Sequence, residues 1–506
     1  MWTATRDPSA VGLRSERGPV LVALMTSVAL VALDTTIIAT AVPSVVQDLG
    51  GFTRFPWVFS AYLLTAAVSV PVYGKLADLV GRKPVMLFGI GLFLLGSVLC
   101  ATAWSLPALI AFRAVQGLGA GAVQPMAMTM VGDLYSLQER ARVQGYLASV
   151  WGVASVVGPA LGGLFSQYSS WRWIFFVNLP IGAVAATLIV RRYAETVERR
   201  GHRIDYAGAG LLTVGCSLVI LGLLEGGQAW AWTSAPGLLV PLTGMGVLVA
   251  FGFVERRAVE PVLPRFVFTR RVLVSGALVG LGVGALVVGL SSYVPTYVQG
   301  VLGTGPLVAG FALAALTIGW PLAAALSGRV YLRIGFRDTA LIGAGVLVLG
   351  TSLTLWFDER TSVWQVAAGC FVIGVGMGLT ASPTLVAVQS AVPWQQRGVV
   401  TATSMFSRSI GSAVGVAIFG ALANATLADR LAQAPSTGPL NGPDAAALVL
   451  DRGGAHSSAV LSLVRSALSD ASHLVFTALL VTAVLIVGAL LLMPRRTMSF
   501  EDLGPR

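Results

Sequence analysis

Charged side chains are scarce in this chain. Asp, Glu, Lys and Arg make up 11% of its 506 residues, whereas hydrophobic residues make up 56%. A soluble globular domain carries about 25% charged residues, and the mean hydropathy here is +0.81. The composition excludes an ordinary soluble domain and indicates a protein that crosses a membrane many times.

Cysteine and histidine are also rare. The three cysteines, Cys100, Cys216 and Cys370, all fall inside apolar runs, so no disulfide framework or metal-ligand spacing is present. The three histidines form no zinc-site pair, and no glycine-rich nucleotide loop with a lysine occurs. We therefore expect no metal, no cofactor and no enzymatic activity.

Acidic residues are scarcer than basic ones: 22 Asp and Glu stand against 33 Lys and Arg, which gives a net charge of +11. The positive residues are spread over short loops between apolar runs and do not gather into one binding face. This pattern is the topology signal of a membrane protein, and it argues against nucleic acid as a partner.

The apolar runs are long enough to cross a bilayer as helices of about 20 residues. The sequence thus predicts an all-α integral membrane protein with about 14 transmembrane helices. The runs fall at about 19–42, 55–74, 84–104, 106–131, 142–166, 172–193, 206–226, 236–254, 272–300, 306–328, 338–357, 363–390, 398–425 and 471–493.

The even number of runs places both termini on one side, and the basic residues indicate which side. Most of the 33 Lys and Arg fall in the termini and alternate loops that we assign to the cytoplasm. The first run follows a polar tail without a small-residue cleavage site, so we read it as a retained helix. The outer loops hold only Arg54, Arg172, Arg360, Arg430, Arg452 and Arg465.

Two opposite charges are predicted at similar depth in the outer half of the membrane. Asp34 lies roughly 12 Å from the outer end of its helix, and Arg113 roughly 10 Å from the outer end of an antiparallel one. Charges within a membrane face a partner or a wet cavity, so we expect them to pair. A purely structural ion pair and a proton-exchanging Asp34 tuned by Arg113 are both open.

Further polar residues within the runs are candidates for cargo contacts. Gln124 shares a helical face with Arg113 and Gly117, and Gln116 lies beside them. Glu225 ends one run near the outer surface, where an ordinary surface carboxylate is the simpler interpretation. Arg408 lies roughly 16 Å into its helix, with no acid evident in the neighbouring runs, so it requires an acid, carbonyls or an anionic group of the cargo.

Three strings carry a family resemblance. Gly74-Lys-Leu-Ala-Asp78-Leu-Val-Gly81-Arg82-Lys83 links the second and third runs as a charged loop with glycine at both ends, and Gly158-Pro159-Ala-Leu-Gly162-Gly163 lies in the fifth. Trp171-Arg-Trp-Ile-Phe-Phe-Val-Asn-Leu-Pro180 leads into the sixth, with Trp171 and Trp173 expected in an interfacial belt. Together with the Asp34 and Arg113 strings, they resemble the major facilitator superfamily, and specifically its fourteen-helix drug:proton antiporters.

The resemblance implies two six-helix halves with an inserted helix pair. The expected parts are a cytoplasmic tail (1–18), an N-terminal half (19–193), the inserted pair with basic flanks (194–258), a C-terminal half (272–493) that includes a partly helical outer loop (426–470), and a second tail (494–506). Gly328 and Gly335 repeat the spacing of Gly74 and Gly81, but Leu332 replaces the acid of Asp78. A latch formed by Asp78 should therefore exist in one half only.

The resemblance also implies a function. It predicts a proton-coupled exporter of hydrophobic or amphipathic molecules such as drugs, working by alternating access in a bacterial inner membrane. Asp34 and Arg113 would couple protons, the Gly74–Lys83 loop would close the inner side with Arg82 and Lys83 near lipid phosphates, and the Gly158–Gly163 string is the mark of an antiporter. The expected partners are protons, amphipathic molecules and lipids, and one copy should suffice.

Two alternative functions stay open. The first is export of a different cargo by the same fold, and the second is a role other than transport. Few acids, Arg408 and the 426–470 loop are also compatible with export of a lipid or an endogenous metabolite. A non-transporting sensor is a different class, and it would show a phenotype only with its partner present.

Overall fold

The computed structural model describes residue 12 and residues 15–49, 56–195, 205–226, 230–231, 233–258, 261–432 and 458–495. Within these residues the regular structure is helical, apart from one isolated bridge between Gly226 and Trp230. The long helices are α1 (Gly18–Leu49), α2 (Pro56–Val80), α3 (Arg82–Ala101), α4 (Leu106–Leu134), α5 (Leu137–Tyr168), α7 (Asn178–Arg192), α8 (Tyr206–Glu225), α9 (Ala235–Glu255), α11 (Arg271–Gly300), α12 (Pro306–Ile334), α13 (Phe336–Leu353), α14 (Val363–Ser390), α15 (Arg397–Ala432) and α17 (Ser458–Leu491), with short turns α6 (Trp173–Phe176), α10 (Phe266–Thr269), η3 (Thr354–Trp356) and η4 (Trp394–Gln396).

The predicted number of membrane helices is confirmed. Thirteen described helices are long and apolar enough to cross a membrane, with α6 and α7 joined in one span, and the shorter apolar helix Ala207–Leu223 makes the fourteenth. Their surfaces expose many large hydrophobic side chains, as expected of a protein surrounded by lipid.

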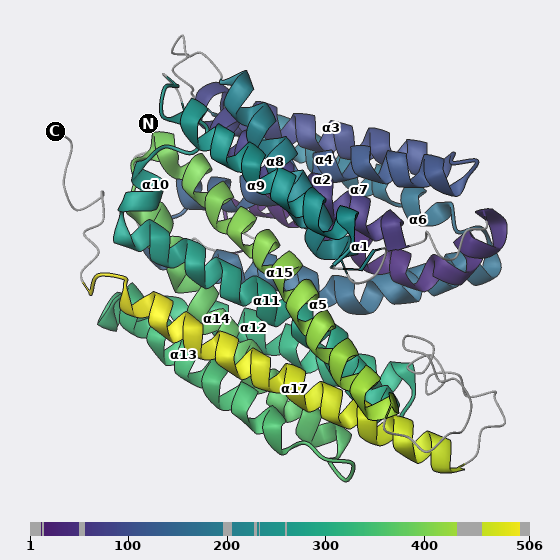
Figure 1. The fold of residues 1–506 in the computed structure, drawn as a ribbon. Helices are drawn as coiled ribbons and strands as arrows, with labels where there is room; N and C mark the ends of the chain where they lie inside the picture. Colours follow the sequence, from purple (N-terminus) through teal and green to yellow (C-terminus); the bar gives the residue numbers. More distant parts are fainter. Residues whose placement is uncertain are drawn as a thin grey trace.

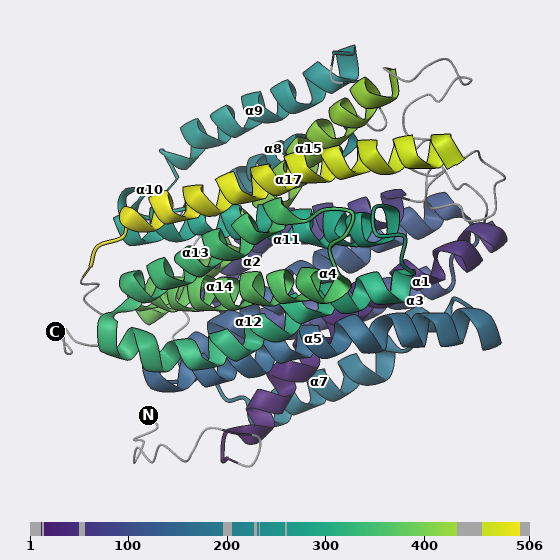
Figure 2. The same ribbon diagram turned by 90° about the horizontal axis from the view of Figure 1, so that it is seen from below.

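The helices form two bundles and a peripheral pair. Figure 1 shows α1–α4 and α7 in the upper part and the green to yellow helices α11–α14 and α17 in the lower part. α8 and α9 pack on each other, α8 also touches α2 and α15, and α9 lies outermost in Figure 2. The proposed division into halves and an inserted pair stays a prediction.

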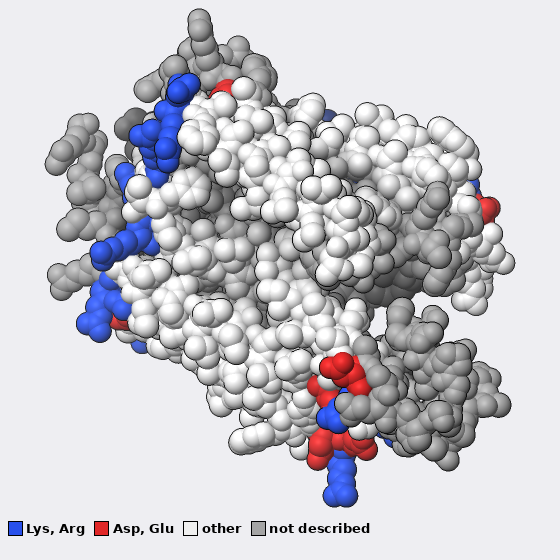
Figure 3. All heavy atoms as spheres, in the orientation of Figure 1, with Lys and Arg blue, Asp and Glu red and all other residues white. Residues whose placement is uncertain are grey.

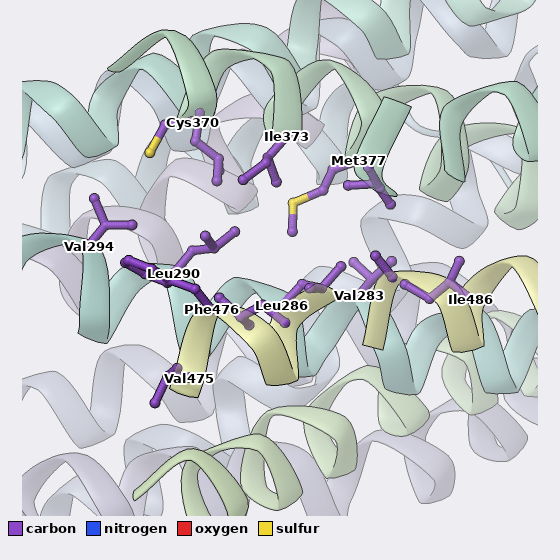
Figure 4. Close-up of a cluster of buried hydrophobic side chains, with 14 of the residues drawn as sticks. Val283, Leu286, Leu290, Val294, Cys370, Ile373, Met377, Val475, Phe476 and Ile486 are labelled. Atoms are coloured by element: carbon purple, nitrogen blue, oxygen red, sulfur yellow. The ribbon is translucent and has the colours of Figure 1, made fainter. Parts of the chain in front are cut away.

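Each bundle has its own apolar core. In the C-terminal bundle, Figure 4 shows side chains of α11, α14 and α17 directed toward one another, among them Leu286, Met377 and Phe476. Tyr297 and Phe357 stack within the same cluster. A separate cluster joins α1–α5 and α7. These cores make each bundle a unit that can move as a body, because packed interiors resist gradual deformation.

Several helices continue beyond the apolar runs that the sequence indicates. The string Gly74–Lys83 is no extended loop: α2 runs to Val80, α3 begins at Arg82, and Gly81 alone turns the chain with φ +103°. α15 and α17 likewise extend into the expected outer loop, leaving residues 433–457 of it outside the described residues. Polar residues are tolerated in these turns because the helix ends leave the membrane.

The polar contacts between the two bundles gather at one end of the molecule, while α5 also packs along α12. Every described polar contact between residues 15–195 and 261–495 lies near the ends of α2, α4, α12 and α14 and the starts of α5 and α15. The beginning of α1, where Arg17 bonds to Leu134 and Glu139, and the end of α17 lie at this end (Figure 2). In Figure 3 the same end carries most of the visible Lys and Arg, and the molecule is notched between the bundles at the other end.

Candidate functional site

Asp34 of α1 is buried, with about 1% of its surface exposed, and accepts hydrogen bonds from three side chains. Arg113 Nη1 of α4 donates to Asp34 Oδ2 at 2.6 Å. Gln116 Nε2 of α4 donates to Oδ1 at 2.8 Å, and Asn178 Nδ2 of α7 donates to the same oxygen at 3.0 Å. Both oxygens of the Asp34 side chain are therefore occupied by donors from α4 and α7.

Arg113 is fixed by its surroundings as well as by its charge. Its Nε donates to the carbonyl of Val58 at 3.3 Å, and its Nη1 also donates to Gln116 Oε1 at 2.6 Å. The guanidinium lies 4.1 Å from the centre of the Tyr62 ring. The expected contact between Asp34 and Arg113 is therefore present, inside the N-terminal bundle; its role in proton coupling stays a prediction.

Sequence reasoning missed two members of this cluster. Ser97 Oγ accepts from Gln116 Nε2 at 2.8 Å and from Asn178 Nδ2 at 3.2 Å, and both Ser97 and Asn178 are fully buried. Asn178 belongs to the string before Pro180, which we interpreted only as a family mark. A lone amide within an apolar span was the available signal, since buried amides require partners.

The neighbouring tryptophans also differ from the expectation. Trp173 is exposed, but Trp171 is buried and donates from Nε1 to Asp48 Oδ2 at 3.0 Å. Arg172 Nη1 donates to the same oxygen at 2.7 Å. These bonds, first from Arg172 and then from Trp171, lower the pKa of Asp48. Trp171 therefore anchors the end of α1 and does not face lipid, because its indole N–H finds a carboxylate partner.

The glycines of the fifth helix place α5 directly against α1. A Cβ at Gly158 would collide with Thr36 Oγ1 and lie 3.2 Å from the amide nitrogen of Ile37. Thr36 Oγ1 in turn donates to the carbonyl of Ala154 at 2.9 Å. Since Thr36 lies two residues from Asp34, this string contacts the helix that holds the buried carboxylate. Gly162 is buried, Gly163 meets no atom within 4 Å, and Pro159 lies within the helix.

Replacing Gly158 by alanine is expected to separate α1 from α5. Overpacking of this kind destabilises by about 1–3 kcal/mol, and we expect transport to slow because the Thr36–Ala154 bond is strained. Thermal unfolding and transport rate measure the two effects. Gly163→Ala is the matched control, since its new methyl group meets open space. Equal effects of both variants would show that the α1–α5 contact is unimportant.

Asp78 joins the end of α2 to the beginning of α15. Its Oδ1 accepts from the amide of Gly398 at 2.9 Å and its Oδ2 from the amide of Val399 at 2.8 Å. A helix N-terminus has free amides and partial positive charge, which favour a carboxylate there. Gly74 permits the approach, because a Cβ there would collide with Ala402 and lie 2.9 Å from the carbonyl oxygen of Gly398.

Arg82 completes this contact between the bundles, which we call the Asp78 latch and define as Asp78, Arg82, Trp394, Gly398 and Val399. Arg82 Nη2 donates to Asp78 Oδ1 at 2.9 Å and to the carbonyl of Trp394 at 2.7 Å. Its guanidinium also lies 3.9 Å from the centre of the Trp394 ring. Arg82 is fully buried, so its expected position near lipid phosphates was wrong: acidic and carbonyl partners hold it inside.

Asp133 of α4 supports the latch from the side. Its Oδ2 accepts from Arg82 Nε at 3.0 Å, and its Oδ1 lies 3.5 Å from Arg397 Nη1. Arg397 Nη1 also donates to the carbonyl of Gly132 at 2.8 Å. The end of α4 is thereby bound to α3 of its own bundle and to α15 of the other bundle, so opening this end must break the contacts with Arg397.

Lys83 was also expected near lipid phosphates, and it instead caps α7. Its Nζ donates to the carbonyls of Val190 at 2.9 Å and Tyr193 at 2.7 Å, which are unpaired carbonyls at a helix end. Glu195 accepts the amides of Arg82 and Lys83, each at 2.8 Å. The beginning of α3 is thus tied to the end of α7 within one bundle.

The second glycine pair forms a different contact. Gly335 turns the chain with φ +90°, as Gly81 does, but Leu332 offers no acceptor and is exposed. The neighbouring Tyr331 donates its hydroxyl to the carbonyl of Leu137, at the beginning of α5, at 2.5 Å. The acidic latch therefore occurs once within the described residues, and a neutral tyrosine contact joins α12 to α5.

The remaining candidates do not join the Asp34 cluster. Gln124 and Arg408 are half-buried, on α4 and α15. Glu225 is buried at the end of α8, so its interpretation as a surface carboxylate was wrong; no basic residue of the described chain forms a salt bridge with it. No group of three His, Cys, Asp or Glu that could hold a metal occurs among the described residues.

Comparison with known proteins identifies the scaffold. The profile of the Major Facilitator Superfamily matches residues 24–416, which is most of the chain. The chain belongs to the Major Facilitator Superfamily. It is 34% identical to the multidrug transporter protein MdtP of Bacillus subtilis over 96% of this chain and 95% of that protein. It is 33% identical to multidrug resistance protein 3 of the same organism, over 81% of this chain and 80% of that protein.

A solved structure supports the fold of this superfamily member independently. The human organic anion transporter MFSD10 (TETRAN) aligns with a TM-score of 0.60 over 92% of this chain and 99% of that chain, at 15% identity. At this identity the likeness concerns the fold alone. Membership of the Major Facilitator Superfamily makes the chain a multi-pass membrane transporter and not an enzyme.

Proposed function

We propose that this transporter is a proton-coupled exporter of hydrophobic or amphipathic small molecules that works as an antiporter by alternating access. Its relatives include proteins named for multidrug transport and multidrug resistance, and the efflux pump dotC of Dothistroma septosporum is 32% identical over 89% of this chain. The observation that carries the proposal is Asp34, a carboxylate buried in an apolar bundle with three donors.

The proposal assigns the end where α1 begins and α17 ends to the cytoplasm of a bacterial cell. The positive-inside rule supports this assignment, because the visible Lys and Arg are concentrated there. The described conformation is then closed toward the cytoplasm by the Asp78 latch. Cargo enters from the cytosol or the inner leaflet when the latch opens, and one copy of the chain suffices.

A chain of contacts connects Asp34 to the interface between the bundles. Thr36, two residues from Asp34, bonds to Ala154 of α5. α5 packs along α12 of the other bundle, where a Cβ at Gly152 would lie 3.3 Å from the carbonyl oxygen of Thr317. When Asp34 binds a proton, its attraction to Arg113 falls, and α1 is free to shift against α5. Protonation thereby biases the position of one bundle against the other, which alternating access requires.

The test measures internal pH in proteoliposomes that hold the purified protein. With an imposed proton gradient, adding a transported cargo is expected to start proton flux, and the flux should disappear in Asp34→Asn. Arg172→Gln is a suitable control, because its bond to Asp48 is solvent-exposed and such pairs contribute little. Undiminished cargo-driven flux in correctly inserted Asp34→Asn would refute the assignment of the proton site.

A second candidate cargo is a lipid or an endogenous metabolite carried by the same mechanism. Arg408 favours it, since no acidic side chain lies on α11, α12 or α14, or near it on α15. A cationic drug would find few acidic partners there. Retained lipid binding together with no flux for any drug would favour this cargo.

A further inference from the structure

Arg408 is the one charged side chain deep within the described C-terminal bundle that has no opposite charge near it. Asp338, Asp358 and Glu359 lie at the ends of α13 or beyond it. Asp429 lies 21 positions further along α15, and Asp470 pairs with Arg430 at 2.9 Å. A cation within a membrane helix is costly and faces a partner or a water-filled cavity, and no acidic side chain of this bundle serves as that partner.

The acids of the N-terminal bundle are already engaged. Asp34 accepts from Arg113, Gln116 and Asn178, while Asp78 and Asp133 hold the closed end through Arg82. With Asp34 and Arg113 neutralising each other, Arg408 is the charge that remains within the helices of the two bundles, while Glu225 lies at the very end of α8. An anionic group is therefore the ligand that this charge distribution attracts.

Arg408 stands on one face of α15 between two serines at helical spacing, Ser404 and Ser412. α11 approaches this face closely, because Gly280 and Gly284 carry no side chain: a Cβ at Gly280 would lie 2.9 Å from the carbonyl oxygen of Ser404. The Ser412 hydroxyl donates to the carbonyl of Gly284 at 3.0 Å. Ser412 is thus satisfied by the helix contact.

The other two residues of this face offer free donors. Within the described residues, the Arg408 guanidinium has no hydrogen-bond acceptor, and neither does the Ser404 hydroxyl. Arg408 is half-buried. Ser404, one turn before it on α15, lines a small cavity together with residues of α10, α11 and α14. A charged side chain within a membrane span faces a partner or a wet cavity, so both groups are available to a ligand that supplies oxygen acceptors.

We propose that Arg408, assisted by Ser404, binds an oxyanion of the cargo. The ligand class is a carboxylate, sulfonate or phosphate attached to an apolar body, because the planar guanidinium matches two oxygens of such a group. This inference rests on the proposed function in one respect, namely that the bound ligand is also transported. The binding site itself does not depend on proton coupling, and it distinguishes anionic from neutral amphiphiles.

The test uses two fluorescent probes that differ only in charge, pyrenebutyrate and pyrenebutanol. Energy transfer from tryptophan to pyrene reports binding to the full chain in phosphatidylcholine nanodiscs, with empty discs as the blank. Arg408→Gln is expected to weaken pyrenebutyrate binding by about tenfold or more, the loss of a charged hydrogen bond, and to leave pyrenebutanol unchanged. The affinity of Arg408→Lys for pyrenebutyrate should lie between that of the unaltered protein and that of Arg408→Gln. Lysine keeps the positive charge but lacks the planar group that can donate to two oxygens at once.

The serines provide a matched pair of variants. Ser404→Ala is expected to weaken pyrenebutyrate binding severalfold, whereas Ser412→Ala should not, because its hydroxyl already bonds to Gly284. If Arg408→Gln binds both probes as the unaltered protein does, the inference is wrong. Repeating the titration with phosphatidylglycerol in the discs identifies the source: Arg408-dependent competition shows that a lipid headgroup supplies the oxyanion, and no competition indicates a soluble cargo.

Stability without ligand gives an independent readout. An uncompensated charge should be replaceable by an apolar residue at no loss, so Arg408→Met is expected to unfold at the same or a higher temperature. A clear loss of stability would reveal a protein partner for Arg408 and overturn the inference. Because none of these measurements uses a proton gradient, absence of antiport and absence of anion binding are separate outcomes.

Discussion

Asp34→Asn alone is expected to lose about 3–5 kcal/mol of folding stability, and the double variant Asp34→Asn, Arg113→Gln to recover most of that loss. The single variant leaves the buried guanidinium without a counter-charge, and arginine cannot neutralise itself by losing a proton. The double variant leaves only neutral amides in the same pocket, where Gln116 and Asn178 remain as partners.

Thermal unfolding of the four proteins of this cycle in one detergent measures the coupling energy between the two sites. Arg113→Gln alone should be less harmful than Asp34→Asn, because the carboxylate keeps Gln116 and Asn178 as hydrogen-bond donors. Additive losses in the double variant would contradict a tight pair. Transport should be lost in both the single and the double variants if Asp34 carries the proton, which separates stability from coupling.

Helix length and membrane depth could be predicted from the sequence, and they were sufficient to bring Asp34 near Arg113. Both residues stand on antiparallel helices at similar distances from the outer ends, so their contact depends on one-dimensional spacing. The fourteen spans could also be predicted, because hydropathy is read along the chain and does not depend on how the helices pack. Such features need no knowledge of how helices pack against one another.

The partners of Asp34 and Arg82 depend on three-dimensional packing and could not be predicted from the sequence. Ser97 and Asn178 reach Asp34 only because α3 and α7 close around α1 and α4. Arg82 seemed to belong to a surface loop because charged residues flank it. It is buried instead because the other bundle covers it with Trp394, a contact between residues 312 positions apart.

The Asp78 latch leads to the second large expected effect, on conformation. Asp78→Asn keeps the size of the side chain but removes its charge and one of its two acceptor oxygens. Hydrogen bonds to a charged group contribute about 1.5–3 kcal/mol each, so we expect the closed end to open at least about tenfold more often. Paired spin labels on Val80 and Ile334, both exposed at this end, measure the shift as a longer distance between the bundles.

Leu332→Ala provides the control, because it occupies the position of Asp78 in the second glycine pair and has no polar contact to lose. The three native cysteines are buried and should not react with the label. Asp78 binds the first amides of α15 and Arg82 of α3, and Arg82 in turn binds Asp133 of α4, so two carboxylates and one guanidinium join α2, α3, α4 and α15. A distance distribution in Asp78→Asn equal to that of the control would mean that the other contacts between the bundles, led by Asp133 with Arg397, hold this end closed without Asp78. Variants at those two residues would then have to produce the opening, because they form the other charged contact between the bundles.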